Sequence, residues 1–178
     1  MTKSPAVILD RDGTLIVDRI YLNDIEAIEY LPGVFEALRM LRDAGFKLAV
    51  ATNQSGVPRG VVDVRVLDAI HVAIRAKFAS EGVDILSFHS APYMTDFDHH
   101  FRKPNPGMLL EAANYYGYDL GKSWMVGDRM TDVEAGHRAG MRSALIGTVE
   151  HPKNSPFLAP EVHARDLLSA AEQIVARK

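Results

Sequence analysis

Short apolar runs alternate with longer amphipathic segments along most of the chain. Runs of three to five residues, bounded by turn or polar residues, are typical of strands that are buried on both faces of a sheet. They predict strands at Ala6–Leu9, Lys47–Ala51, Ile85–His89, Trp124–Val126 and Ser143–Ile146. Because strands separated by helices need crossover connections, this alternation predicts a central, mainly parallel sheet.

The segments between these strands carry apolar residues at helical spacing. Val34, Leu38 and Leu41 fall on one face of a helix that Gly45 is placed to end. The predicted helices are Val34–Ala44, Asp63–Ser80, Pro106–Tyr116, Asp132–Ala139 and Asp166–Ala176. We therefore expect an α/β fold of three layers, with helices on both faces of the sheet.

Two stretches break the alternation. Ile16–Leu31 contains β-rich pieces with turn residues between them, and we expect a small β-hairpin flap there. His89–Pro106 is a polar loop at the end of a strand, where such sheets bind ligands. Neither is long enough for a large cap domain, so residues 1–178 are expected to form a single domain. The stretch Pro152–Pro160 is expected to be a surface loop.

Composition narrows the class of protein. Of 178 residues, 47% are hydrophobic and 24% charged, as in ordinary globular proteins, and the net charge of -3 offers no basic surface for nucleic acid or membranes. The absence of cysteine excludes disulfides and thiolate metal sites. Met1–Pro5 has no signal-peptide pattern, and the apolar runs are too short to span a bilayer. We expect a cytoplasmic protein, with a monomer as the default.

The segment Asp10–Thr14 (DRDGT) follows the first predicted strand directly. Side chains two residues apart point the same way as a strand ends, so the carboxylates of Asp10 and Asp12 should face one site. One carboxylate could attack a phosphorus atom while the other gives a proton to the leaving oxygen. Gly13 would let the chain turn sharply out of the sheet. The alternative is an ordinary acidic surface turn.

Two further groups suit a phosphate ligand. The segment Thr52–Gly56 (TNQSG) follows the second strand and offers a hydroxyl and turn amides to phosphate oxygens. Lys103 lies just before the third predicted helix, where its ammonium could neutralise a bound phosphate. Taken singly, each has an ordinary interpretation, as a polar turn or a solvated lysine.

Asp128 and Asp132 follow the fourth strand. Together with the Asp10 and Asp12 pair they would form the oxygen-rich site that Mg²⁺ prefers. For Asp132 a direct metal role and a simple role as an acid at a helix N-terminus both stay open. Because a parallel sheet brings these strand ends to one edge, the four groups together predict one magnesium-dependent phosphatase site.

The chain resembles the haloacid dehalogenase-like phosphatases, whose four motifs fall on these residues along nearly its whole length. It is most similar to the subgroup of D-glycero-D-manno-heptose 1,7-bisphosphate phosphatases and histidinol-phosphate phosphatase domains. The matching segments are Leu9–Thr14, Asp18, Thr52–Gly56, Arg59–Gly60, Arg102–Pro104, Pro106–Met108 and Val126–Asp128. The resemblance implies a Rossmann-like sandwich with a hairpin flap at Ile16–Leu31.

The resemblance also implies a role for each matching residue. Asp10 would be the nucleophile and a Mg²⁺ ligand, and Asp12 the general acid/base, with its backbone carbonyl on the metal. Asp128 would be the third protein ligand, while Thr52 and Lys103 would hold the transferring phosphoryl group. The implied substrate-binding residues are Arg11, Asn53, Gln54, Arg59 and Arg102.

One departure from the subgroup is large. Its members usually carry a zinc loop, Cys-x-His and then Cys-x-Cys, just before the Arg-Lys-Pro motif. Aligned on Pro92 and Arg102, the four ligand positions are here Ala91, Tyr93, His99 and Phe101, so we expect no structural zinc. A replacement site would have to be drawn from His89, Asp96, Asp98, His99 and His100.

The expected substrate is a small phosphorylated sugar. Heptose 1,7-bisphosphate comes first, because Arg59 and Arg102 add cationic contacts beyond the reacting phosphate. Histidinol phosphate or another small sugar phosphate comes second, and a nucleic-acid 3′-phosphate third, since the acidic net charge opposes it. The alternative from another class is a non-catalytic binding protein on the same fold.

Overall fold

The computed structural model describes residues 3–148, 150–152 and 155–178 of the chain. A six-stranded sheet runs through its middle, with strand order β3-β2-β1-β4-β5-β6. All neighbouring strands pair in parallel. The strands are β1 (Ala6–Leu9), β2 (Lys47–Asn53), β3 (Ile85–Ala91), β4 (Trp124–Gly127), β5 (Arg142–Ile146) and β6 (Val162–Ala164).

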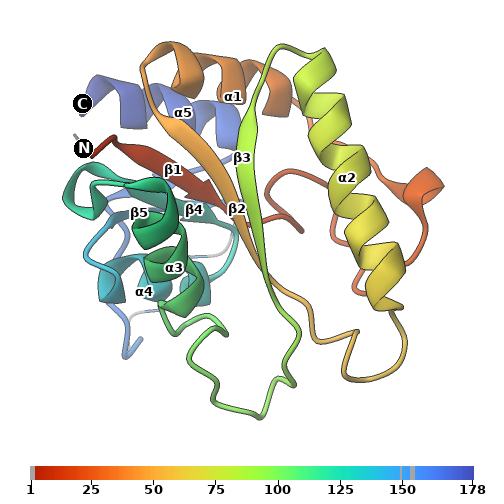
Figure 1. Cartoon of the computed structure of the whole chain (residues 1–178). Helices are drawn as coiled ribbons and strands as arrows, with labels where there is room; N and C mark the ends of the chain where they lie inside the picture. Colours follow the sequence, from red (N-terminus) through yellow and green to blue (C-terminus); the bar gives the residue numbers. More distant parts are fainter. Residues whose placement is uncertain (1–2, 149, 153–154) are drawn as a thin grey trace.

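Helices cover both faces of the sheet, which confirms the predicted sandwich (Figure 1). On one face lie α1 (Val34–Asp43), α2 (Val64–Ser80) and α5 (Leu167–Ala176), and on the other α3 (Gly107–Tyr116) and α4 (Met130–Arg138). In the described part of the chain, two short 3₁₀ helices, η1 (Ile25–Ala27) and η2 (Leu120–Lys122), lie in connecting loops.

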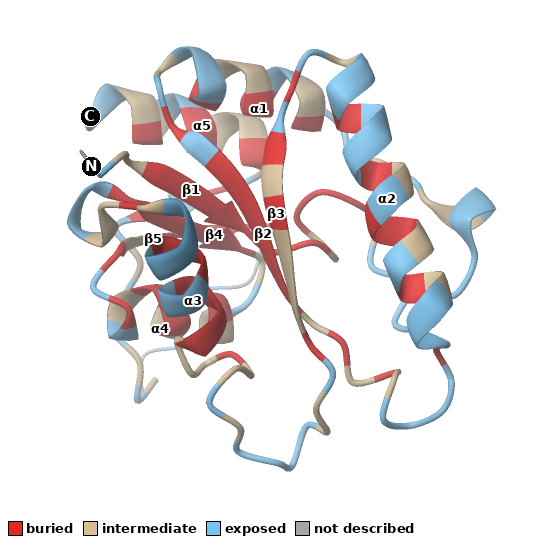
Figure 2. Ribbon diagram, in the orientation of Figure 1, coloured by how far each residue is buried: buried red, intermediate tan, exposed pale blue. Residues whose placement is uncertain are grey.

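The alternation of side chains along β1 divides the core into two. Val7 and Leu9 point into the cluster under α1, α2 and α5, whereas Ala6 and Ile8 point into the cluster under α3 and α4. All four residues of β1 are fully buried, and Figure 2 shows β1 with its neighbours β2 and β4 as a mainly buried layer between helices with exposed outer faces. This central strand is therefore a rigid base for the residues that follow it.

The structure departs from the predicted elements in two places. The chain pairs Val162–Ala164 with β5, a strand that the sequence pattern did not predict, because three residues form no recognisable apolar run. Within Ile16–Leu31 the expected hairpin is reduced to one antiparallel bridge between Ile16 and Tyr30, and the loop that this bridge closes holds η1. Part of the predicted loop Pro152–Pro160, residues 153–154, lies outside the described residues.

The longest helix of the described part of the chain, α2, is amphipathic and has an exposed charged face. Among the described residues, no helix combines the length and the apolarity that crossing a bilayer requires.

Candidate active site

A pocket of about 430 Å³ opens where β1, β2 and β4 end. Its lining comes from the turns after these strands, the loop after β3 and the segment Asp18–Tyr21 over the opening. The strand order reverses direction at β1, so the connections on its two sides diverge and leave a crevice there. The predicted motifs therefore meet at the place where open parallel sheets bind ligands.

Three carboxylates gather around the floor of this pocket, which two of them, Asp10 and Asp132, line. One oxygen from each of Asp10, Asp128 and Asp132 lies within 4.8 Å of the other two. Asp10 and Asp132 are almost fully buried, at 7% and 2% exposure. Three acidic groups so close would repel one another strongly, so the cluster needs a cation to be stable.

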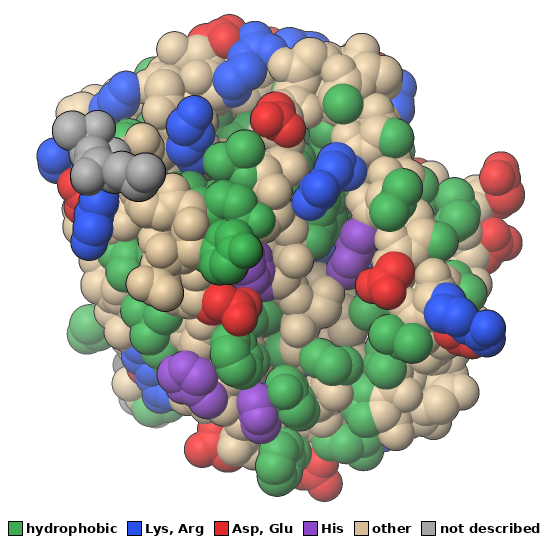
Figure 3. Space-filling view, viewed as in Figure 1, with side chains coloured by type: hydrophobic (Ala, Val, Ile, Leu, Met, Phe, Trp, Pro, Cys, Tyr) green, Lys and Arg blue, Asp and Glu red, His purple; other side chains and the backbone are tan. Residues whose placement is uncertain are grey.

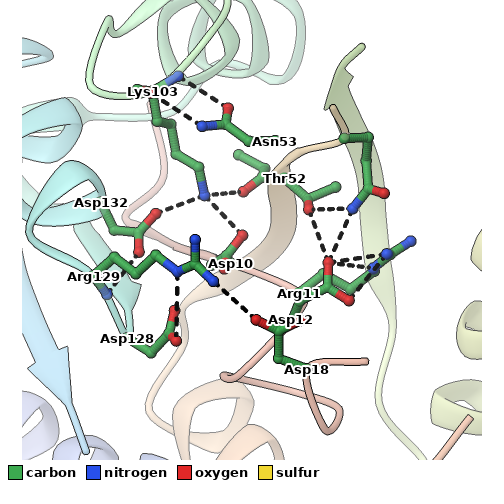
Figure 4. A network of polar contacts seen from close by, with 12 residues as sticks. Asp10, Arg11, Asp12, Asp18, Thr52, Asn53, Lys103, Asp128, Arg129 and Asp132 are labelled. Atoms are coloured by element: carbon green, nitrogen blue, oxygen red, sulfur yellow. Dashed lines mark hydrogen bonds and ion pairs between the residues drawn. The ribbon is translucent and has the colours of Figure 1, made fainter. Parts of the chain in front are cut away.

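The ammonium of Lys103 supplies one such charge. Its Nζ lies 2.7 Å from Asp10 Oδ1 and 2.6 Å from Asp132 Oδ1, and it also donates to the carbonyl oxygen of Ala51 at 2.7 Å. Figure 4 shows the lysine reaching down between the two carboxylates. Lys103 is only 3% exposed, so it is a buried ion-pair partner rather than a solvated surface charge.

Burial and the neighbouring charges shift the pKa values of these groups. Burial raises the pKa of Asp10, although the neighbouring Lys103 charge acts against this. Burial, together with the charges of Asp10 and Asp132, raises the pKa of Asp128 to about 7. Burial lowers the pKa of Lys103, but Asp10 and Asp132 outweigh it and hold that pKa above its usual value, so the lysine stays charged.

Asp12 points into the same pocket and is held from two sides. Gln54 Nε2 donates to its Oδ2 at 2.9 Å, and Thr52 Oγ1 lies 3.5 Å from the same oxygen. On the other side the Arg11 guanidinium forms a fork with both carboxylate oxygens, at 3.0 and 3.1 Å. Burial raises the pKa of Asp12 in spite of the Arg11 charge, which suits a group that must gain and lose a proton.

The expectation that Arg11 binds substrate does not agree with its position. Its side chain is 1% exposed and is absent from the pocket lining. Besides Asp12, its only side-chain partner in the described structure is His71 of α2, whose Nε2 accepts from Nη1 at 3.2 Å. Burial, with the charges of Arg11 and Arg75, lowers the pKa of His71 to about 3, so this imidazole stays a neutral acceptor. Arg11 therefore orients the Asp12 carboxylate from the buried side, away from the pocket.

Asn53 is a second residue whose contacts are internal. Its amide forms a matched pair of hydrogen bonds with the backbone of Lys103, donating to O and accepting from N at 3.0 Å each. Asn53 also lines the pocket, so it both positions the Lys103 segment and faces a ligand. Gln54 likewise lines the pocket while holding Asp12.

Three arginines converge near the pocket mouth. Burial, and then the charges of Arg129 and Arg59, lower the pKa of Arg102. The positive charges of Arg129 and Arg59 thus act on the Arg102 guanidinium. Arg102 and Arg129 line the pocket, and Arg59 donates to the lining residue Thr95 at 3.1 Å. Arg129 is bound to Asp18 of the flap at 2.8 Å, as Figure 4 shows. This rim is suited to a second anionic group.

Sequence reasoning did not identify Arg129 and left Asp132 undecided. Arg129 directly follows Asp128, and an arginine beside a candidate metal ligand was the signal available. Asp132 Oδ2 accepts from the backbone N of Arg129 at 3.1 Å while its Oδ1 pairs with Lys103. It is thus both a helix N-terminal acid and a member of the carboxylate cluster.

The residues at the floor are a suitable donor set for a divalent cation. Asp128 Oδ1 is buried and has no hydrogen-bond partner among the residues that the structure describes, which leaves an unsatisfied carboxylate oxygen beside Asp10. Gly13, at φ +77°, lies against the Asp128 carboxylate, where a Cβ would collide with it. Carboxylate oxygens with room for waters and phosphate are what Mg²⁺ requires.

Comparison with known proteins places this site in a family. The family model described as HAD-hydrolase-like matches residues 100–169. A D-glycero-beta-D-manno-heptose-1,7-bisphosphate 7-phosphatase of Pseudomonas aeruginosa is 38% identical over 143 residues, which are 80% of each chain. A D-glycero-alpha-D-manno-heptose-1,7-bisphosphate 7-phosphatase of Photorhabdus laumondii is 33% identical over 161 residues, 86% of this chain and 88% of the other.

Solved structures agree in fold over nearly the full length. The D,D-heptose 1,7-bisphosphate phosphatase from B. bronchiseptica, complexed with magnesium and phosphate, superposes with a TM-score of 0.86 at 31% identity, covering 98% of this chain and 99% of the other. A HAD-like phosphatase from Mesorhizobium loti gives 0.84 at 34% identity, covering 98% and 88%.

Proposed function

The chain belongs to the HAD-like hydrolases and is a phosphatase, and from this we propose that it uses Mg²⁺ to release the 7-phosphate of D-glycero-D-manno-heptose 1,7-bisphosphate. One observation carries the proposal. Asp10 and Asp12 face one pocket from the end of β1, and Lys103 lies 2.7 Å from Asp10. A nucleophile, an acid and a phosphate-binding cation are thus present together.

In the proposed reaction, Asp10 attacks the phosphorus and forms an aspartyl phosphate, while Asp12 protonates the leaving sugar oxygen. Asp12 then removes a proton from the water that hydrolyses the intermediate, and returns to its starting state. Lys103 offsets negative charge on the phosphoryl oxygens, and Thr52 donates a hydrogen bond to them. Arg11 and Gln54 keep the Asp12 carboxylate turned toward the leaving group.

Asp10 and Asp128, with the backbone carbonyl of Asp12, would hold the Mg²⁺. When bound, the ion would supply positive charge to the phosphoryl oxygens as they develop negative charge. Asp132 fixes Lys103 and the Arg129 backbone beside it.

The rim of arginines supports a bisphosphate over a simple phosphate ester. A phosphate distant from the reaction would accept hydrogen bonds from Arg102 and Arg129, and Arg59 would add charge nearby. This positive rim would also draw a dianionic substrate toward the pocket. We further propose that the enzyme acts in the cytoplasm as a single-domain monomer on this small substrate.

The test of this function is phosphate release with Mg²⁺ present, measured on both anomers of the heptose bisphosphate, histidinol phosphate, simple sugar phosphates and a 3′-phosphorylated oligonucleotide. We expect kcat/KM to be highest for one heptose bisphosphate. Weak activity of similar size on every compound would support phosphatase activity but would contradict heptose bisphosphate as the substrate. No turnover of any compound would favour a binding protein on this fold.

We expect the affinity for Mg²⁺ to depend on pH through Asp128. Because its pKa in the metal-free protein is raised to about 7, a proton competes with the metal below that pH. Calorimetric titration with Mg²⁺ should show affinity falling as pH drops below 7, by up to about tenfold per pH unit if one proton is displaced.

Asp128→Asn is the control for that titration. It should bind Mg²⁺ more weakly at every pH and should lose most of the pH dependence. Equal affinity of the native protein at pH 6 and pH 8 would contradict competition between Mg²⁺ and a proton on Asp128 near pH 7.

A further inference from the structure

The loop between β3 and α3 contributes three residues to the pocket lining, Thr95, Arg102 and Lys103. Its tip is exposed: in Figure 3 hydrophobic and histidine side chains gather at the lower part of the view, over the loop that follows β3 in Figure 1. A long exposed loop needs internal contacts if its lining residues are to hold fixed positions.

Stacked rings provide these contacts. The ring of His99 lies on that of Tyr93, with centroids 3.5 Å apart and planes 18° from parallel. Phe97 and Phe101 stack against His99 as well, each at 5.9 Å. Tyr93 and Phe101 also pack on the core beneath α3 and α4, so this aromatic stack joins the loop to the body of the protein.

The two central residues of the stack each hold one end of Arg102. The backbone N of Arg102 donates to the carbonyl oxygen of His99 at 2.8 Å. Its guanidinium Nη1 donates to the carbonyl oxygen of Tyr93 at 3.1 Å. The position of Arg102 at the pocket mouth therefore depends on the rings of His99 and Tyr93 remaining stacked.

A zinc ion does not fit the loop of this chain. Of the four positions that carry zinc ligands in the resembling subgroup, Ala91 and Phe101 offer no donor, and Tyr93 is packed face to face on His99. His99 Nδ1 already accepts from the backbone N of Phe101 at 3.2 Å. His89, proposed for a replacement site, contacts Glu111 and Ser87 instead. Among the described residues, the sole cluster of three acidic or histidine ligands is the one at the pocket floor.

We propose that the stack of His99 on Tyr93, and not a bound metal, orders this loop, and that His99 is a positioning residue for recognition of the substrate's second phosphate through Arg102. This rests on the proposed function. It assigns a specificity role to a ring that does not touch the reacting phosphate. The stacked, flat ring of His99 then carries most of the effect, and the hydrogen bond that its Nδ1 accepts from Phe101 adds a smaller part.

The experiment compares His99→Ala, which removes the stack, with His99→Phe, which keeps a flat ring. His163→Ala, an exposed histidine on β6, controls for the loss of a histidine. Each variant is assayed on heptose 1,7-bisphosphate and on heptose 7-phosphate, which lacks the second phosphate.

With His99→Ala, KM for the bisphosphate should rise about tenfold or more, the size expected for one charge-assisted hydrogen bond, with kcat nearly unchanged. KM for heptose 7-phosphate should stay the same, and His99→Phe and His163→Ala should resemble the native enzyme. His99→Phe behaving like His99→Ala, or one zinc per chain by elemental analysis, would overturn the proposal.

Hydrogen exchange of the loop gives a readout that needs no substrate. The amide of Arg102, which donates to the carbonyl oxygen of His99, should be protected in the native protein and in His99→Phe after treatment with a chelator, and unprotected in His99→Ala. If the native enzyme does not prefer the bisphosphate but this protection pattern is found, the substrate assignment fails and the stack's ordering role stands. Equal protection in His99→Ala and the native protein would overturn the stack's ordering role.

Discussion

Replacing the nucleophile, Asp10→Asn, should reduce kcat by at least about 10⁴-fold, the size seen when the attacking group of a covalent mechanism is removed. The amide has the shape of the carboxylate but cannot form the acyl phosphate. Since Asp10 is buried beside Lys103, the variant loses one ion pair, yet Asp132 still neutralises the lysine. The fold should therefore survive, as judged by circular dichroism and thermal unfolding.

A matched control uses a carboxylate outside the site. Asp68→Asn changes an exposed aspartate on α2 and should leave kcat and KM unaltered. An Asp10→Asn protein that is folded and still turns over at the native rate would contradict the mechanism.

Replacing the buried cation, Lys103→Met, should have the largest combined effect on activity and stability. Removing one oxyanion-stabilising donor costs about 10²–10³ in kcat. The change also leaves Asp10, Asp128 and Asp132 together without their ammonium partner, and breaking a buried pair in this way costs roughly 3–5 kcal/mol of unfolding free energy. Because carboxylates that lose a cation protonate more easily, the stability loss should be greatest above pH 7 and smaller in mild acid.

Denaturant unfolding of Lys103→Met, with and without Mg²⁺, measures that loss. Mg²⁺ should restore part of it, since the ion would neutralise the same carboxylates. Lys77→Met breaks an exposed pair between α2 and Glu81, the residue that follows this helix, and should cost less than about 1 kcal/mol, because solvent screens such pairs. Equal stability of the two variants would show that Lys103 does not neutralise the cluster.

Much of the site could be predicted because a parallel sheet brings the ends of its strands to one edge. Asp10, Thr52 and Asp128 are more than 40 residues apart in sequence, but each follows a strand, and β2 and β4 both pair with β1. Once the alternation predicted a parallel sheet, these strand ends had to share one edge. Lys103 could be placed only by its motif, because its burial depends on the loop that carries it.

What the sequence could not reveal depends on tertiary contacts. An arginine is usually exposed, so nothing in the pattern indicated that Arg11 would be buried between Asp12 and His71. The alternate aromatic positions Phe97, His99 and Phe101 were visible in the sequence, but stacking with Tyr93 depends on how the loop closes. β6 is defined by its parallel pairing with β5, which the three residues of this strand do not indicate by themselves.

The central claim is that a phosphoryl group is carried on Asp10, and trapping that intermediate tests it most directly. Asp12→Asn should remain able to react with p-nitrophenyl phosphate, whose leaving group needs little protonation, but should hydrolyse the intermediate slowly for lack of a base. Acid-quenched protein, digested and weighed by mass spectrometry, should then carry one phosphoryl group on the peptide that contains Asp10. The double variant Asp10→Asn, Asp12→Asn should carry none. Phosphate on another peptide, or a release burst from Asp12→Asn with no labelled peptide, would contradict the account.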